Sequence, residues 1–181
     1  MVENEIFFYN ESPAILSDYT ELCERLFGFQ PTACLNHGKP FLLLPGKPIV
    51  LLLEKAFGQI VGGHSRTKSV PQAILSAPDE VVAAFLSALF DGDGSLSLSG
   101  KVSLEYASAS ERLAQGVMIL LNRLGAVGRI SSSIKSATNS SHPIKRTYWR
   151  VVVYGADSVS CLGAQLSFKH EEKQRRLKHV Q

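Results

Sequence analysis

The sequence predicts an α+β fold, and three observations carry this prediction. From residue 78 to the C-terminus, helical and strand-like patterns follow one another in the order α-β-β-α-β-β-α. Residues 1–60 show an imperfect earlier copy of this order at an offset of ~100 residues, as an internal repeat of one supersecondary unit would. Hydrophobic residues make up 45% of the 181 residues, which is enough for one domain or for two small half-domains that share a core.

The second copy begins with an apolar helix that runs into two acids separated by glycines. Residues 85–95 read FLSALFDGDGS, so Asp91 and Asp93 come at the expected end of the helix. Gly92 and Gly94 are expected to free the chain to turn there, with no long side chain beside the acids. A second helix of this kind packed alongside would bring two carboxylates together, which suits a divalent metal and phosphoryl chemistry.

Two small residues within this helix indicate a contact surface. Ser87 and Ala88 interrupt the apolar stretch, and small side chains let another backbone approach closely. We therefore expect Ser87 and Ala88 to lie in an interface between two helices, including the interface of a homodimer.

The Asp-Gly-Asp-Gly tetrapeptide by itself has other interpretations. It is compatible with a hairpin turn, with a plain connection from helix to strand, and with half of a calcium loop. A calcium loop that opens at Asp91 requires a bidentate Glu at its twelfth position, where this chain has Val102. The calcium loop is therefore strongly disfavoured, and the plain connection remains the alternative for the tetrapeptide alone.

The elements after the tetrapeptide are predicted from periodicity and from turn residues. Apolar residues recur at helical spacing between 110 and 124, with Ser108 or Ser110 as the N-cap and Gly125 as the C-cap. A polar loop is expected at 135–147. The predicted elements are strands at 95–99 and 101–107, a helix at 110–124, strands at 127–134 and 148–154, and helices at 157–168 and 171–180.

The first copy is predicted to be incomplete. Gly28 takes the place that Gly125 has in the second copy, but no room for a counterpart of the apolar helix and its following strand precedes Ile6. The predicted elements are a strand at 6–10, a helix at 11–27, strands at 32–35 and 40–44, and a helix at 48–57. We thus expect a partial module at 1–60, a basic connector at 61–77 and a complete module at 78–181.

Residues 86–94 resemble the signature of the LAGLIDADG (dodecapeptide) homing endonucleases, which include the endonuclease domains found inside inteins. They match it as leucine, two small residues, leucine, an apolar residue, Asp, a small residue, Asp and Gly. The resemblance implies the homing-endonuclease fold, with saddle-shaped antiparallel sheets that grip DNA. It also implies that Asp93 is the metal ligand and that Asp91 and Gly94 cap the helix and form the turn.

The same resemblance implies a site-specific endonuclease that hydrolyses both strands of double-stranded DNA. In that scheme Asp93, a main-chain oxygen near Gly92 and phosphate oxygens hold Mg²⁺, which prefers hard oxygen ligands. A lysine near the scissile phosphate is usual in the family. Lys173 is the first candidate for it and Lys169 the second, since both follow the last core helix.

Basic residues on a hairpin and in the connector are candidates for contacts with DNA, although a solvated surface is the plain alternative for each cluster. A twisted basic hairpin can lie in the major groove, where base edges are distinguishable. On the strand at 101–107 only one of the neighbours Glu105 and Tyr106 can face the site, because strand side chains alternate. The candidate DNA-binding residues are Lys135, Lys145, Arg146 and Arg150 around the hairpin, and Arg66 and Lys68 in the connector.

The chain departs from the two-motif pattern of the family, because it has one complete motif. One motif supplies one metal-binding acid, so a homodimer through the motif helix or a separate partner segment would have to supply the second. The alternatives are a degenerate module that binds DNA or RNA without cutting it, and an inactive fragment that is stable only with a partner. Residue 1 is Met and the chain ends in His-Val-Gln, so self-splicing is not expected.

The composition of the chain restricts its possible partners, its compartment and the kinds of metal site it could have. The net charge of +3 supports a nucleic-acid partner only weakly. The three cysteines are scattered, which favours a reducing, intracellular compartment, and the isolated histidines disfavour a zinc site. No signal peptide and no apolar stretch long enough to span a membrane is present, so no membrane partner is expected.

Overall fold

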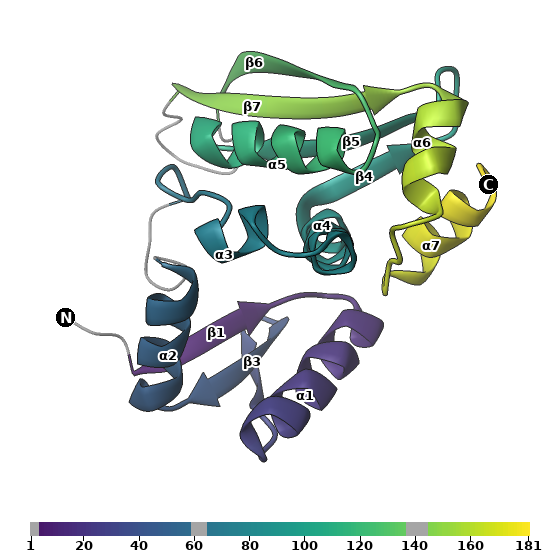
Figure 1. Cartoon of the computed structure of the whole chain (residues 1–181). Helices are drawn as coiled ribbons and strands as arrows, with labels where there is room; N and C mark the ends of the chain where they lie inside the picture. Colours follow the sequence, from purple (N-terminus) through teal and green to yellow (C-terminus); the bar gives the residue numbers. More distant parts are fainter. Residues whose placement is uncertain (1–3, 59–64, 137–144) are drawn as a thin grey trace. The chain divides into compact units, whose positions relative to one another are not determined.

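We describe the protein from a computed structural model that defines residues 4–58, 65–136 and 145–181 (Figure 1). The chain divides into two compact units. The N-terminal unit comprises residues 1–63 and 169–171, and the C-terminal unit comprises residues 64–168 and 172–181.

The C-terminal unit contains a four-stranded antiparallel sheet with the strand order β4-β5-β7-β6. Its elements confirm the predicted α+β class and the order α-β-β-α-β-β-α. They are α3 (Gln72–Leu75), α4 (Asp79–Asp93), β4 (Gly94–Ser97), β5 (Ser103–Ser108), α5 (Glu111–Arg123), β6 (Gly128–Ser136), β7 (Lys145–Tyr154), α6 (Ala156–Gly163) and α7 (Glu171–Lys178).

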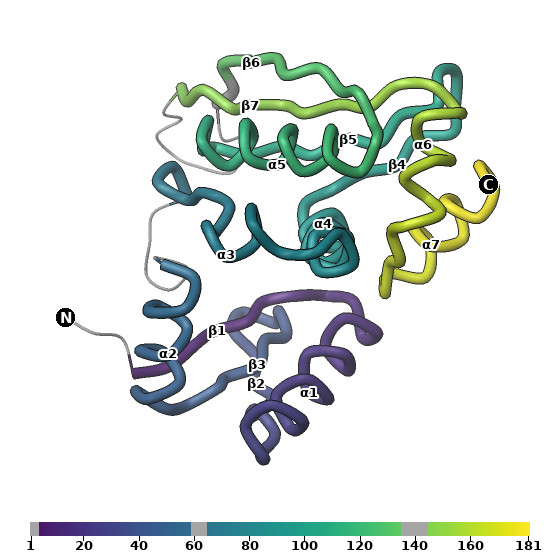
Figure 2. Tube along the Cα trace, in the orientation of Figure 1, coloured from purple at the N-terminus to yellow at the C-terminus, as the bar shows by residue number. Residues whose placement is uncertain are grey.

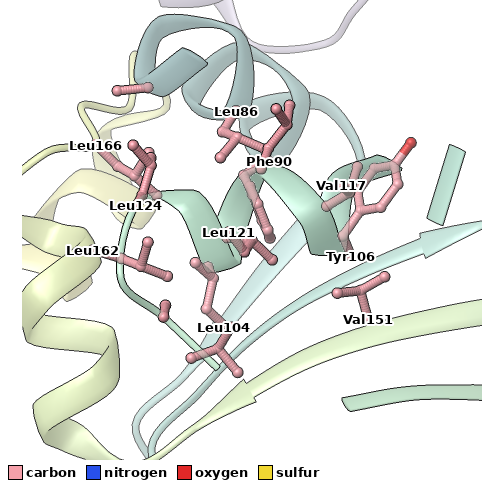
Figure 3. Packing of buried hydrophobic residues seen from close by; sticks show 14 of the residues in the cluster. Leu86, Phe90, Leu104, Tyr106, Val117, Leu121, Leu124, Val151, Leu162 and Leu166 are labelled. Carbon is pink, nitrogen blue, oxygen red and sulfur yellow. The ribbon is translucent and has the colours of Figure 1, made fainter. Parts of the chain in front are cut away.

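One face of this sheet carries the core of the unit (Figure 3). Alternate residues of β5, such as Leu104 and Tyr106, point into the core and are at most 2% exposed. The apolar sides of α4 and α5 meet them through Phe90, Val117 and Leu121, all of which are buried. Among the described residues, no helix of this core covers the opposite face of the sheet, which carries Glu105, Arg129 and Arg150.

The N-terminal unit contains a three-stranded antiparallel sheet with the strand order β1-β3-β2 (Figure 2). Phe8 of β1 stacks on Tyr19 with ring centroids 4.2 Å apart, and Leu42 and Leu44 of β3 are buried on that same face. The elements are β1 (Glu5–Tyr9), α1 (Pro13–Phe27), β2 (Thr32–Asn36), β3 (Lys39–Pro45) and α2 (Lys47–Phe57).

The two units share one topology. The order β1-β3-β2 corresponds strand by strand to β5-β7-β6, and the helices α1 and α2 follow the same strands as α5 and α6. Gly28 and Gly125 both adopt left-handed φ values, of 77° and 86°, just after α1 and α5. Gly46 and Gly155 have positive φ values, of 133° and 95°, just before α2 and α6. β1 lies at the edge of its sheet, where β5 is paired with β4.

The structure corrects three details of the predicted elements. A short helix, α3, lies within the expected connector. The hairpin strands β6 and β7 extend to Ser136 and from Lys145, because cross-strand pairs such as Lys135 with Arg146 continue the ladder into the expected polar loop. The helix expected at 157–168 ends at Gly163, since the N–H of Ser167 donates to Ser87 Oγ and that of Phe168 to Gln174 Oε1 instead of to helical carbonyls.

Candidate active site and nucleic-acid interface

The two acids lie at the end of α4, as predicted, but the glycines act differently from the prediction. The helix continues through Asp93, and Gly94 has extended angles (φ −88°, ψ 159°), so neither Gly92 nor Gly94 needs a positive φ. A Cβ at Gly94 would lie 2.5 Å from Phe90 Cδ1 and 2.6 Å from Phe90 O. Gly94 is thus required by the close packing of Phe90. A Cβ at Gly92 would meet nothing within 4 Å.

The two acids have different surroundings. Asp91 is 6% exposed, whereas the side chain of Asp93 is exposed at the surface. Burial, and secondly the charge of Asp93, raise the pKa of the nearby Tyr106 to about 12. Tyr106 also packs edge-on against Phe90, with ring centroids 5.9 Å apart. Of the two neighbours on β5, Tyr106 is therefore the one on the side of the acids. Glu105 lies on the other face of the sheet.

Lys173 on α7 lies beside the acidic end of α4. Its Nζ donates hydrogen bonds to Phe90 O at 2.8 Å and to Asp91 O at 2.7 Å. Burial lowers the pKa of Lys173, and the negative charges of Asp91 and Asp93 act in the opposite direction. The structure thus brings the first candidate lysine to the predicted site. It also shows that two of its three N–H donors bind main-chain carbonyls at the C-terminal end of α4, where Phe90 O additionally accepts from the N–H of Gly94.

Arg176 is a second residue of α7 that holds this region. It lies one turn after Lys173, and its Nη1 donates to Leu96 O in β4 at 3.0 Å. Glu172 accepts from Arg176 Nε at 2.9 Å and so orients the guanidinium. The sequence shows a run of basic residues at the C-terminus, namely Lys169, Lys173, Arg175, Arg176 and Lys178, but nothing in that run indicates that Arg176 faces the acidic turn.

Lys169, the second candidate lysine, belongs to the N-terminal unit. It forms an ion pair with Asp18 of α1, with Nζ 2.8 Å from Oδ1. Lys169 therefore has a structural partner within that unit, in contrast to Lys173, which binds the end of the motif helix.

Ser87 and Ala88 point in different directions from α4. Ser87 is 7% exposed, and its hydroxyl donates to Ala83 O at 2.7 Å and accepts from the N–H of Ser167 at 3.0 Å. Ser87 thus stabilises the C-terminal unit internally. The exposed side of α4 carries Ala84, Ala88 and Gly92, which recur at helical spacing. This series of small residues is the part of the helix surface that another helix could approach closely.

The site holds too few ligands for a metal ion by itself. Among the residues that the structure describes, no group of three or more His, Cys, Asp or Glu side chains could hold a metal. The exposed carboxylate of Asp93 and main-chain oxygens at the end of α4 are hard oxygen donors that fit Mg²⁺, which commonly keeps several waters or phosphate oxygens. The remaining ligands would have to come from outside the described unit.

The candidate DNA-binding residues gather on the open face of the C-terminal sheet and on its hairpin. Arg146 and Lys145 are exposed on β7, and Arg150 forms an ion pair with Glu105 at 2.8 Å. Arg129 of β6, which no sequence pattern singled out, is exposed and lies opposite Val152 of β7. Alternation along the ladder places Ser131 and Ser133 on this face as well.

The remaining candidates were predicted in the polar loop and in the connector. The backbone of Lys135 pairs with Arg146 in the ladder, while the rest of the loop, at 137–144, lies outside the described residues. Arg66 and Lys68 are exposed, and the carbonyl of Lys68 accepts a hydrogen bond from Ser110 Oγ at the start of α5. The end of the connector is further fixed by Val70, which packs directly on Gly116.

Comparison with known proteins agrees with this geometry. The family model of the LAGLIDADG-like domain matches residues 80–163, which begin in α4 and include the acidic turn and the sheet. Residues 80–163 belong to the LAGLIDADG family. This confirms the family resemblance that residues 86–94 indicated.

Solved structures share the fold of this chain. A structure of the homing endonuclease I-DmoI in complex with DNA and Ca has a TM-score of 0.65 and 14% identity, with 97% of this chain and 83% of that chain covered. A structure of mesophilic variants of I-DmoI has a TM-score of 0.63 and 14% identity, with 90% and 76% covered. The fold class is therefore that of the LAGLIDADG homing endonucleases.

Curated relatives with different names contain a segment similar to part of this chain. A DNA polymerase of Thermococcus hydrothermalis is 35% identical over 117 residues, which is 65% of this chain and 6% of the polymerase. An A-type ATP synthase subunit of Pyrococcus abyssi is 29% identical over 160 residues, which is 88% of this chain and 15% of that protein. The chain thus spans a small part of the relatives that it matches. No helix among its described residues is long and apolar enough to cross a membrane.

Proposed function

We propose that this protein is a Mg²⁺-dependent, site-specific DNA endonuclease of the homing type. The observation that carries the proposal is the exposed carboxylate of Asp93 at the end of α4, in a LAGLIDADG-like domain whose sheet has an open polar face. The matching segments in a DNA polymerase and in a component of an ATP synthase favour a mobile element, such as an intein endonuclease, over the functions of those two proteins. A DNA substrate is consistent with action inside the cell.

The residues of the site have separate roles in this proposal. Asp93 and the main-chain oxygen of Gly92 would hold the Mg²⁺, which when bound stabilises negative charge on the phosphate and activates a water. Asp91 is buried and serves the structure of the helix end. Lys173 holds the carbonyls of Phe90 and Asp91, and its third N–H can face the phosphate.

The open face of the C-terminal sheet is the proposed contact surface for DNA. Charged and hydroxyl side chains line it, and these are the groups that bind phosphates and the edges of bases. The hairpin formed by β6 and β7 carries most of the positive charge, with Arg129, Arg146 and Lys145 exposed. Arg66 and Lys68 would add phosphate contacts from the connector.

Cleavage of both strands needs a second acid, and two features indicate where a partner would bind. The first is the exposed series Ala84, Ala88 and Gly92 on α4, which fits a second motif helix. The second is the free edge of β1, where the C-terminal unit has β4 paired with β5. We propose that the partner is either a second copy of this chain or a segment that consists of an acidic motif helix and a short strand.

The test of the function is metal-dependent cleavage of a randomised duplex library. We expect nicking or cutting that requires Mg²⁺ and that disappears in Asp93→Asn. Asp157→Asn, which changes an exposed acid at the start of α6, is the matched control and should retain activity. Sedimentation of the wild type with DNA at tens of micromolar separates the homodimer from the single chain, because a persistent monomer would exclude the homodimer.

A second candidate function is a degenerate module that binds DNA without cutting it. The observation that favours it is the lack of a group of three metal-binding side chains among the described residues. Retention of library DNA without any nicking, at several divalent-metal conditions and with the partner segment added, would shift the conclusion to this function.

A further inference from the structure

The shared topology of the two units allows their sheets to be compared residue by residue. Gly46 directly follows β3 and Gly155 directly follows β7, so the two ladders can be aligned from these glycines. Residues in equivalent rows of the two open faces differ in chemical type. Row by row, Ala107–Arg150–Ser131 corresponds to Tyr9–Phe41–Cys34, and Glu105–Val152–Arg129 corresponds to Phe7–Leu43–Thr32.

The open face of the N-terminal sheet is aromatic. Phe7 and Tyr9 are 51% and 50% exposed, and both pack on Phe41, with ring centroids 5.9 and 4.9 Å apart. The polar groups around them already have partners, because Asn36 Nδ2 donates to the Tyr9 hydroxyl at 3.4 Å. Lys39 is paired with Glu11 at 3.5 Å. The open face of the C-terminal sheet carries arginine and serine side chains, whereas the open face of the N-terminal sheet carries aromatic side chains.

The charges of the two parts have opposite signs. Residues 1–63 contain four Lys and Arg against seven Asp and Glu, a net charge of −3. Residues 64–181 contain fifteen against nine, a net charge of +6, and the two values sum to the +3 of the whole chain. Neutralisation of phosphates by Lys and Arg supplies most non-specific affinity for DNA, and hydrogen-bonding side chains read base edges. The N-terminal sheet has few Lys and Arg residues and few hydrogen-bonding side chains on its open face.

From these observations we infer that the C-terminal sheet alone reads the DNA sequence, and that the aromatic face of the N-terminal sheet makes no base contacts. The inference rests on the proposed DNA-binding function and restricts it to one of two homologous surfaces. β7 has ten residues. A strand of that length extends over about 33 Å, which is about one turn of B-DNA. One chain therefore specifies a single block of about one turn of DNA.

The experiment is a binding-site selection with the wild-type protein in EDTA, so that the result does not depend on cleavage. The library is a duplex randomised over about three turns. We expect the selected sequences to share one continuous block of constrained base pairs of about one turn or less for each bound chain, so that a homodimer would select two copies of the same block as an inverted repeat. Two constrained blocks of different sequence, separated by unconstrained positions, would overturn the inference while leaving DNA binding intact. Selection of no sequence at all would overturn the proposed site-specific function itself.

Matched variants at equivalent positions of the two sheets identify which surface reads the block of constrained base pairs. Arg129 and Thr32 occupy equivalent rows, as do Glu105 and Phe7. We expect Arg129→Ser to weaken binding to the selected site roughly fivefold or more and to relax part of the block. Phe7→Ser and Thr32→Ala should leave both the affinity and the block unchanged. A loss of constrained positions in Phe7→Ser, at unchanged circular dichroism, would show that the aromatic face reads bases after all.

Discussion

At the scale of single residues, Gly94 and Gly92 are chemically identical but have different reasons to be glycine. Alanine at Gly94 would push its Cβ to 2.5 Å from the ring of Phe90, so we expect Gly94→Ala to lower the free energy of unfolding by about 1–3 kcal/mol. Gly92→Ala meets open space inside a helix and should stabilise the unit by up to ~1 kcal/mol. Denaturant unfolding of both variants checks this. Equal losses of stability would contradict it.

Lys173 provides a second prediction at this scale. Lys173→Met removes two hydrogen bonds to the end of α4 and a positive charge beside the buried Asp91. We expect a loss of about 1–3 kcal/mol in the free energy of unfolding, together with loss of nuclease activity. Lys178→Met, which removes an exposed lysine of the same helix, is the control and should change neither. A stable but inactive Lys173→Met would instead indicate a role confined to the chemical step.

Tyr106 makes the stability of the protein depend on alkaline pH. Its pKa is raised from 10.0 to about 12, so the folded state holds the phenolic proton more tightly than the unfolded state does. The stabilisation is fully present below pH 10 and is lost as the pH rises toward 12. We expect Tyr106→Phe to flatten this part of the profile of unfolding free energy against pH. If the slope between pH 10 and 12 is unchanged in Tyr106→Phe, the loss of stability at alkaline pH comes from other groups.

At the scale of elements, α4 has an inner and an outer side, and a substitution on each side tests a different function. Ala88 is exposed, so Ala88→Leu should leave the melting temperature within a degree or two and still abolish double-strand cleavage if a second helix packs there. Ser87→Leu should instead unfold the C-terminal unit, because it breaks the contacts with Ala83 and Ser167. Full cleavage by Ala88→Leu would exclude the exposed side as a helix interface.

The sequence predicted most elements well, because hydrophobic periodicity and turn residues are local signals. The end of the last core helix was not predictable, since it depends on Ser87, some eighty residues away, accepting the N–H of Ser167. The length of the hairpin was underestimated for a similar reason, as polar residues such as Arg146 join a ladder only when their partners are in register. At the site, the spacing of the acids was sufficient to predict that Asp93 lies at the end of the motif helix. The direction in which the side chain of Ser87 points from α4 could be determined only from the three-dimensional packing.

At the scale of the whole molecule, the two units differ in how much apolar surface they bury. Among the residues that the structure describes, the buried hydrophobic residues of the N-terminal unit are Cys23, Leu42, Leu44 and Val50, whereas the C-terminal core has more than twenty such residues. We expect residues 5–57 to exchange amide hydrogens faster than residues 82–136 and 145–168. Hydrogen-exchange mass spectrometry measures this. Uniform protection over both ranges would show that the chain unfolds as one cooperative unit.

The edge position of β1 has a consequence for the behaviour of the isolated chain in solution. Glu5–Tyr9 reads EIFFY, an apolar run with unpaired backbone groups along one side and no proline. Such edges are templates for pairing with further copies, and short β-prone runs of low charge promote ordered aggregation. Without a strand to cover β1, concentrated protein should precipitate through this edge. Phe7→Lys, which places a charge on the edge strand, should keep it soluble.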